Sequence, residues 1–214
     1  DNYDGSTLPN GFSQPGMGIS FTKTEISGNP ALKYVNEYIP ENSGTSNFSI
    51  KGTEPLDFSK GALLLSYDVT PQSNLTWLGD GAKSNILIPT LRIGSTEISQ
   101  LSIIEHGGIK AAYKTAPTAW GRSAYLTGWE NNTLVADTTV KFQLLLEKEG
   151  NKITATQYIN EKPVYYTLSD EAKLASVTVD ITEEELAKEW TLTMAGRRFP
   201  NGLVFDNFHI TTVD

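Results

Sequence analysis

The sequence contains no cysteine. Disulfide bonds, thiolate catalysis and zinc sites with cysteine ligands are therefore excluded. The two histidines, His106 and His209, are too few for a three-histidine zinc site. No apolar run approaches the roughly 20 residues that a membrane-spanning helix needs, so we expect no membrane insertion.

Basic residues are also scarce. The chain has 214 residues, and its 17 Lys and Arg against 25 Asp and Glu give a net charge of −8 and a pI of about 4.8. A nucleic-acid partner needs a basic face, which this composition argues against. An acidic surface fits neutral or cationic partners or bound cations, and it also simply keeps a protein in solution.

Sequence motifs of several enzyme classes are missing. The chain has no G-x-S-x-G nucleophile motif, no phosphate-binding loop and no dinucleotide fingerprint. It also lacks the closely spaced acidic residues that sandwich-fold glycosidases carry on one strand. The sequence therefore favours binding over catalysis.

Short segments in which apolar and polar residues alternate run along most of the chain. This period of two predicts about twelve strands separated by turns. Thr182 followed by Glu185 forms a capping-box pattern, which predicts one short helix over 182–188. No strand–helix–strand alternation occurs, so the chain is predicted to be all-β, an antiparallel β-sandwich in one domain, 1–214. The predicted strands are 17–26, 31–39, 47–51, 60–71, 85–93, 97–104, 139–148, 153–159, 164–168, 174–181, 190–194 and 203–213.

Two features of this pattern carry further expectations. The four strands between 139 and 181 predict an antiparallel meander, in which each strand pairs with the next. The stretch 106–132 has no clear period, so we expect a long loop there. Long loops in compact domains are more often functional or disordered than incidental.

A carboxylate interrupts the last predicted strand, 203–213. Asp206 has the same parity as Val204, Phe208 and Ile210, which places it on an apolar face if the alternation is regular. A buried carboxylate is costly unless it finds donors, a cation or a bend that carries it to the edge.

Four segments spread along the chain form a recognisable set: DGSTLPNGF (4–12), LDFSKGALLLSYDV (56–69), VKFQLLLEKEGNKITATQYINEKPV (140–164) and FDNFHI (205–210). Together they resemble jelly-roll carbohydrate-binding modules of bacterial extracellular glycan-degrading enzymes, and more broadly concanavalin-like sandwiches. The resemblance covers about half of the chain and implies a β-sandwich of the jelly-roll type. It also implies a secreted or cell-surface location, a polysaccharide or oligosaccharide partner, and a place within a larger multidomain protein.

In several of these families the closing aspartate and an acidic residue near the N-terminus hold a structural calcium ion. That role maps onto Asp206 and Asp4. Calcium takes six to eight oxygen ligands, which two chain ends brought together could supply. In the alternative interpretation, Asp206 caps a bulge and accepts backbone N–H bonds.

Aromatic residues in predicted loops are the candidates for ligand contacts. A sugar has apolar C–H faces and polar edges, so a sugar site needs exposed aromatic rings beside polar side chains. Trp190 alternates with Leu192 and Met194 and is predicted to be core. The candidate binding residues are Trp77, Asp80, Trp120, Arg122, Tyr125, Trp129 and Asn131.

Two other functions stay open at this point. One is a sandwich-fold polysaccharide lyase or glycoside hydrolase that uses the 105–130 region. The other is a structural or adhesive module without a glycan ligand.

Overall fold

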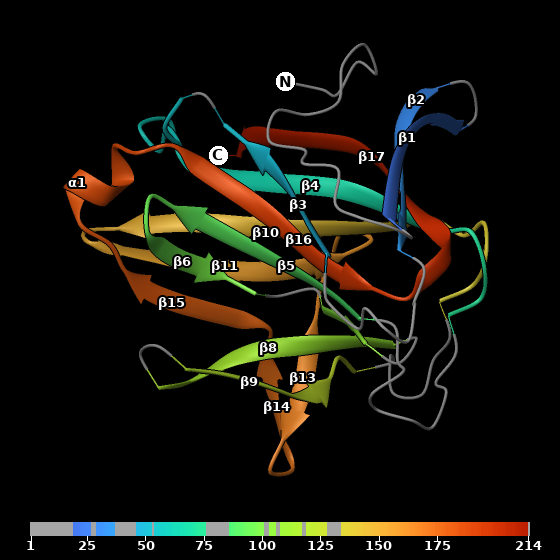
Figure 1. Ribbon diagram of the computed structural model, residues 1–214. Helices are drawn as coiled ribbons and strands as arrows, with labels where there is room; N and C mark the ends of the chain where they lie inside the picture. Colours follow the sequence, from blue (N-terminus) through green and yellow to red (C-terminus); the bar gives the residue numbers. More distant parts are fainter. Residues whose placement is uncertain are drawn as a thin grey trace.

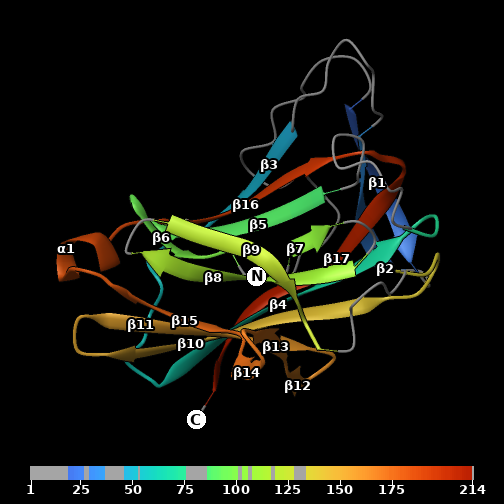
Figure 2. The same ribbon diagram turned by 90° about the horizontal axis from the view of Figure 1, so that it is seen from below.

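The computed structural model describes residues 19–26, 29–36, 46–52, 54–75, 86–100, 103–105, 108–116, 119–127 and 134–213. Within them, two antiparallel sheets pack face to face, which confirms the predicted β-sandwich (Figure 1). Figure 2 shows the layers edge-on, with β10, β11 and β15 in one and β5, β16, β8 and β9 in the other. No described helix has the length and apolar character that crossing a membrane requires.

The larger sheet has eight strands in the described part of the chain. In spatial order they are β1 (Ile19–Ile26), β2 (Asn29–Asn36), β17 (Phe199–Val213), β4 (Ala62–Pro71), β10 (Val140–Glu149), β11 (Lys152–Ile159) and β12 (Lys162–Pro163), with β15 (Ser176–Asp180) also paired to β11.

The second sheet has seven described strands. They are β3 (Ser46–Lys51), β16 (Trp190–Arg197), β5 (Ile86–Ile93), β7 (Ile103–Glu105), β8 (Gly108–Ala116) and β9 (Ala119–Tyr125), with β6 (Thr96–Ser99) beside β5. A separate hairpin consists of β13 (Tyr165–Leu168) and β14 (Glu171–Leu174), and the short helix α1 spans Glu183–Leu186.

The chain crosses repeatedly from one sheet to the other, as in a jelly roll. β3, β5 and β16 lie in one sheet, whereas β4, β15 and β17 lie in the other. The closing strand β17 pairs with β2 through its first half, up to Phe205, and with β4 from Leu203 to Val213, so its first half lies between two strands of the larger sheet.

The hydrophobic core fills the space between the sheets. From β4, Leu65 and Tyr67 point inward, and from the facing sheet Leu91 and Leu192 line the same small internal space. Trp190 is 8% exposed, which confirms its predicted core position. Burying one such side chain contributes about 1.5–3 kcal/mol to folding, so this alternation fixes which face of each strand is inside.

The stretch 106–132 was expected to be a loop, and this prediction is wrong: it contains the β8–β9 hairpin. Register shifts on both sides of the Tyr113–Lys114 pair break the period of two. Gly121 lies in the same irregular part of the hairpin, where a Cβ would come within 2.5 Å of the Tyr113 ring. That ring stacks on Tyr166 of β13 at 5.5 Å, so the hairpin is anchored by an aromatic pair.

The predicted meander is correct for β10 and β11, and the chain then returns onto β11 only through the short strand β12 and Val164. β15 pairs directly with β11, and β13 turns back onto β14 instead. The turn between β13 and β14 has Ser169 at φ 53° and Asp170 at φ 64°. Two consecutive positive φ values match the twist of a two-residue hairpin, which explains why this segment folds on itself.

Candidate functional site

A groove with a volume of about 910 Å³ lies between the two sheets at one side of the sandwich. One wall comes from the β5–β6 turn, β6 and the β8–β9 hairpin, and the opposite wall from β15. We call it the Trp120 groove. Its lining consists of Ser95, Thr96, Glu97, Gln100, Lys114, Thr115, Ala116, Trp120, Thr178, Val179 and Asp180.

Trp120 is the aromatic side of this groove. It is half-buried and packs against the core cluster. Its partner across the β8–β9 ladder is Lys114, whose Nζ lies 4.0 Å from the centroid of the indole ring. A cation over an aromatic face contributes about 0.5–1 kcal/mol when it is exposed to solvent. The ring is therefore held in place from two sides.

Glu97 is fixed within its wall. Its Oε2 accepts a hydrogen bond from Arg92 Nη2 at 2.6 Å, and Gln100 Nε2 donates to the other carboxylate oxygen. Arg92 and Glu97 are Cα partners in the β5–β6 ladder, so the hairpin itself sets up this ion pair. The negative charge of Glu97 is thereby balanced next to the groove.

The helix α1 anchors the β5–β6 turn. Glu185 accepts hydrogen bonds from the backbone N of Ser95 at 2.7 Å and from its Oγ at 3.1 Å, and Gly94 N donates to Glu189 O. The hydrogen bond from Lys188 and those from Ser95 lower the pKa of Glu185 to about 2. Thr182 accepts from Glu185 N, as the capping pattern predicted, but the Glu185 carboxylate serves the turn. This positions Ser95 and Thr96 in the groove.

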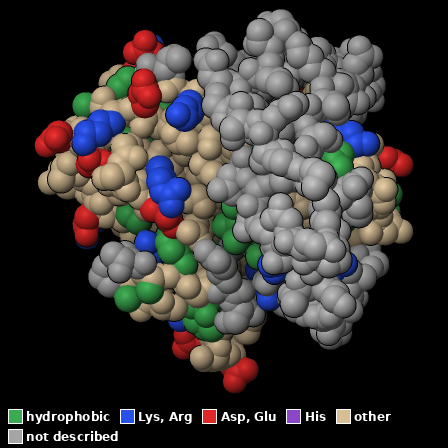
Figure 3. Space-filling model, in the orientation of Figure 1, with side chains coloured by type: hydrophobic (Ala, Val, Ile, Leu, Met, Phe, Trp, Pro, Cys, Tyr) green, Lys and Arg blue, Asp and Glu red, His purple; other side chains and the backbone are tan. Residues whose placement is uncertain are grey.

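The chemistry of the groove is mixed. Hydroxyl groups come from Ser95, Thr96, Thr115 and Thr178, and β15 adds the carboxylate of Asp180. Together with Gln100 and Lys114, these groups can both donate to and accept from a ligand rich in hydroxyl groups. On the described part of the face in Figure 3, basic and acidic side chains are interspersed with hydrophobic ones, so neither sign of charge dominates it.

Of the predicted binding residues, Trp120 lines the groove. The backbones of Arg122 and Tyr125 lie in β9, while their side chains, together with Trp77, Asp80, Trp129 and Asn131, lie outside the described residues. Sequence reasoning missed Glu97, Lys114 and Asp180. For Glu97 a signal existed, since Arg92 and Glu97 flank the Gly94-Ser95 turn at positions that face each other in a hairpin.

Asp206 sits at a β-bulge in β17. The register with β4 shifts between Asp206 and His209, and Asn207 has a φ of 50°. Asp206 Oδ1 accepts a hydrogen bond from Asn207 N at 2.7 Å. The bulge reverses the alternation, so Asp206 pairs with Asp68 on the outer face, away from the core. The alternative in which Asp206 caps a bulge is confirmed. The position on an apolar face, which a regular alternation predicts for Asp206, is wrong.

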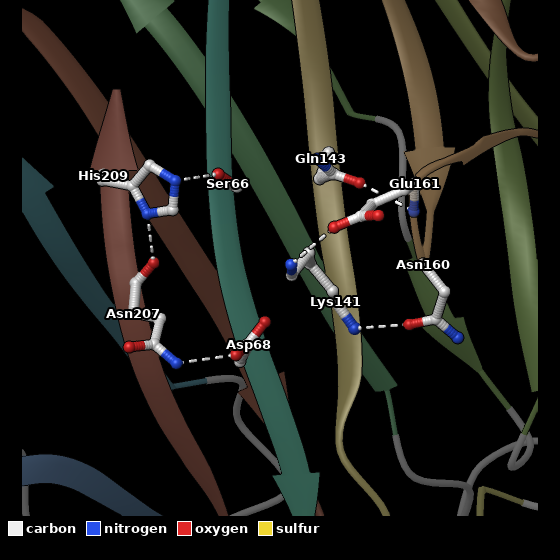
Figure 4. Close-up of polar contacts among 8 residues, drawn as sticks. All are labelled: Ser66, Asp68, Lys141, Gln143, Asn160, Glu161, Asn207 and His209. Carbon is white, nitrogen blue, oxygen red and sulfur yellow. Dashed lines mark hydrogen bonds and ion pairs between the residues drawn. The ribbon is translucent and has the colours of Figure 1, made fainter. Parts of the chain in front are cut away.

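A polar network surrounds this bulge (Figure 4). Asn207 Nδ2 donates to Asp68 Oδ2 at 2.8 Å. His209 Nδ1 lies 2.8 Å from Asn207 O, and its Nε2 lies 2.8 Å from Ser66 Oγ. A carbonyl oxygen only accepts, so Nδ1 is the donor in its contact with Asn207 O. Partial burial raises the pKa of Asp206, and the charge of Asp68 raises it further.

The predicted calcium site involves one residue of this network, Asp206. Asp206 and Asp68 supply two carboxylates, each already accepting from Asn207. The part of the chain that the structure describes contains no group of three or more His, Asp or Glu that could hold a metal ion. Calcium needs six to eight oxygens, so the described residues do not form a calcium centre by themselves. Asp4 lies outside them, and the role of calcium stays a prediction.

No known family model matches the sequence, and no curated protein sequence matches it. Several solved structures are similar in fold. The carbohydrate recognition domain of Emp46p in its metal-free form has a TM-score of 0.48 at 10% identity, covering 100% of both chains. The CBM2 module of the evolved Dit of Lactobacillus casei BL23 phage J-1 has 0.44 at 8% identity, covering 99% of this chain and 94% of that one. An alginate lyase from Klebsiella pneumoniae has 0.38 at 14% identity, covering 96% and 86%. What this chain binds has to be inferred from its own groove.

Proposed function

We propose that this protein is a non-catalytic carbohydrate-binding domain and that its ligand occupies the Trp120 groove. The proposal depends on one observation: a held tryptophan ring forms one side of a groove whose other groups are hydroxyls, carboxylates, an amide and an ammonium. Sugars need this combination, because their C–H faces pack on aromatic rings while their hydroxyl groups need donors and acceptors. The resemblance to secreted bacterial modules supports a role outside the cell.

The size of the groove favours an oligosaccharide. Its volume of about 910 Å³ stands near the upper end of the range of about 300–1,000 Å³ that is typical of ligand sites. A single sugar ring would leave most of this space empty. We therefore infer that several consecutive rings of a glycan chain bind between β15 and the β8–β9 hairpin.

The charges favour a neutral glycan. Glu97 is balanced by Arg92, and the remaining charged groups of the lining, Asp180 and Lys114, have opposite signs. A sugar that stacks on Trp120 has to move the Lys114 ammonium off the ring, after which that group can donate to sugar oxygens. The cation–π contact itself is weak in solvent, so its loss costs little.

Binding rather than hydrolysis is supported by how Glu97 is held. A glycosidase needs two carboxyl groups aimed at the bond that is cleaved. Both oxygens of Glu97 instead accept hydrogen bonds from Arg92 and Gln100 within the wall of the groove. The carboxylate thus serves to shape the site.

The test is Trp120→Ala, measured by affinity electrophoresis and calorimetry against a panel of plant and microbial glycans. We expect at least a tenfold loss of affinity, because a central aromatic contact contributes about 2 kcal/mol or more. Tyr165→Ala is the matched control, since Tyr165 is an aromatic residue that is 46% exposed and lies outside the groove. Circular dichroism and the Tm establish that both variants are folded.

Two results would contradict the proposal. One is that no glycan of the panel binds the wild-type protein. The other is that Trp120→Ala binds as tightly as Tyr165→Ala. New reducing ends or unsaturated products in the same incubations would identify a hydrolase or a lyase instead.

A further inference from the structure

We propose that a second groove, on another side of the sandwich, is a second sugar-binding site. It has a volume of about 480 Å³ and lies between β3, the segment 54–60 and the C-terminal half of β17. We call it the Trp190 groove. The expected class of ligand rests on the function proposed for the Trp120 groove. The residues that support this second site are different, because the two grooves have no lining residue in common.

The floor of the Trp190 groove is aromatic. The rings of Trp190 and Phe208 stack with their centroids 6.0 Å apart and an interplanar angle of 23°. Phe208 is half-buried and lines the groove together with Ile210. Part of an apolar ring surface therefore remains open in a concave site, as a sugar face requires.

Two backbone features create this floor. The bulge at Asn207 turns Phe208 to the inner side of the larger sheet, whereas Asp206 before it takes the outer side. Gly52 passes directly over the Trp190 indole, where a Cβ would collide with Nε1, and its N donates to Trp190 O at 3.1 Å. Trp190 therefore stays 8% exposed, and the half-buried Phe208 is the more accessible ring of the floor.

The rim supplies the polar partners. Lys51 and Lys60 face the groove together with Glu54 and Asp57, and the exposed Thr211 and Thr212 add hydroxyl groups. Hydrogen bonds from the Ser59 side chain and from Ser59 N, the latter at 2.9 Å, hold the pKa of Asp57 below its ordinary value, and the charge of Lys60 lowers it further. The rim thus carries charges of both signs, and with its aromatic floor the groove repeats the chemistry of the Trp120 groove.

The two grooves stand well apart. One lies at β17 and the other at β15, and along the larger sheet these strands are separated by β4, β10 and β11. Four steps of about 4.8 Å give a separation of about 19 Å. Two sites at this distance can bind two segments of a polysaccharide at once, which raises the apparent affinity without further contacts.

The experiment is a calorimetric titration with β-1,4-linked hexaoses of glucose, xylose and mannose. We expect two molecules per chain for wild type, one for Trp120→Ala and one for Phe208→Leu, which keeps an apolar side chain on Trp190 but removes the ring. Tyr165→Ala, outside both grooves, should keep two. Near-ultraviolet circular dichroism and the Tm establish that the variants are folded.

The other outcomes separate this inference from the proposed function. One molecule per chain, lost in Trp120→Ala and unaffected by Phe208→Leu, overturns the second site and leaves the first standing. One molecule per chain, lost only in Phe208→Leu, supports the Trp190 groove and overturns the Trp120 groove. No binding of any hexaose overturns both.

Discussion

A single residue in the left-handed region decides how the last strand faces the rest of the molecule. Asn207, at φ 50°, lets two residues of β17 oppose one residue of β4. Asparagine tolerates this conformation better than most side chains. As a result, Asp206 faces Asp68 on the outer side of the sheet, while Phe208 reaches Trp190 in the second groove. One bulge therefore removes a carboxylate from the core and places an aromatic ring in a candidate site.

Asp206→Asn is expected to stabilise the protein at pH 7 in the presence of EDTA. The amide oxygen can still accept from Asn207 N, whereas the charge that faces Asp68 is lost. Partial burial raises the folded-state pKa of Asp206 above 3.8. Its proton therefore favours the folded state below pH 3.8, and this stability is lost as the pH rises through the folded-state pKa. Urea unfolding should show a gain of a few tenths of a kcal/mol at pH 7, because Asp206 itself is only partly buried and solvent screens its charge.

That gain should shrink as the pH falls toward 3. A variant less stable than wild type in EDTA at pH 7 would contradict this account of Asp206. Calcium provides a separate comparison. If Asp206 and Asp4 hold the predicted ion, added calcium raises the Tm of wild type and leaves that of Asp206→Asn unchanged.

At the scale of elements, a helix of four residues holds a hairpin turn. The one apolar residue of α1, Leu186, is partly buried against the core, and no residue of the helix is fully buried. Its Glu185 collects donors from Ser95 and Lys188, and this connects the chain after β15 to the turn that enters the Trp120 groove. The element is small, yet it fixes the position of groove residues far away in the sequence.

Glu185→Gln is expected to lower the free energy of unfolding at pH 7. The folded-state pKa of Glu185 is about 2, below its ordinary value of 4.5. Its contribution is therefore present above pH 4.5 and is lost as the pH falls toward 2. Urea unfolding at several pH values should show a difference between wild type and Glu185→Gln that disappears over this interval. Glu184→Gln is the control, since Glu184 is 88% exposed in its side chain. A difference that persists at pH 2, or that Glu184→Gln reproduces, would show that Glu185 does not act through its charge.

Elements with an unbroken period of two could be predicted from the sequence, whereas register shifts hid the β8–β9 hairpin and, in β17, the side of the sheet that Asp206 faces. β4 and β10 alternate regularly and were found within two residues at each end. β8 and β9 were missed, because their register shifts twice and Gly121 stands where an apolar residue would mark the pattern. In the candidate site, a residue that its type makes recognisable could be predicted, and a residue placed only by strand pairing could not. Trp120 was predicted from its residue type, whereas Asp180 meets it only because β15 pairs with β11, a contact that no local pattern encodes.

At the scale of the whole molecule, the net charge differs from the balance of charges within the two grooves. The net charge of −8 makes the surface repel polyanions at long range. Each groove nevertheless carries both signs, and the described surface in Figure 3 shows basic and acidic groups side by side. Long-range attraction of a charged ligand is therefore not the basis of binding, and the contacts within the grooves have to supply the affinity.

The affinity for a neutral glycan is therefore expected to be insensitive to salt. Between 50 and 500 mM NaCl, calorimetry on wild type should show a change of less than about twofold, because stacking and hydrogen bonds to neutral groups are not screened. A uronate polymer such as alginate should bind more weakly than the neutral glycans, and most weakly at low salt, where repulsion by the acidic protein is strongest. An affinity that falls steeply with added salt would reverse this assignment. It would identify an anionic ligand and make Lys114, above the Trp120 ring, the first residue to test for binding it.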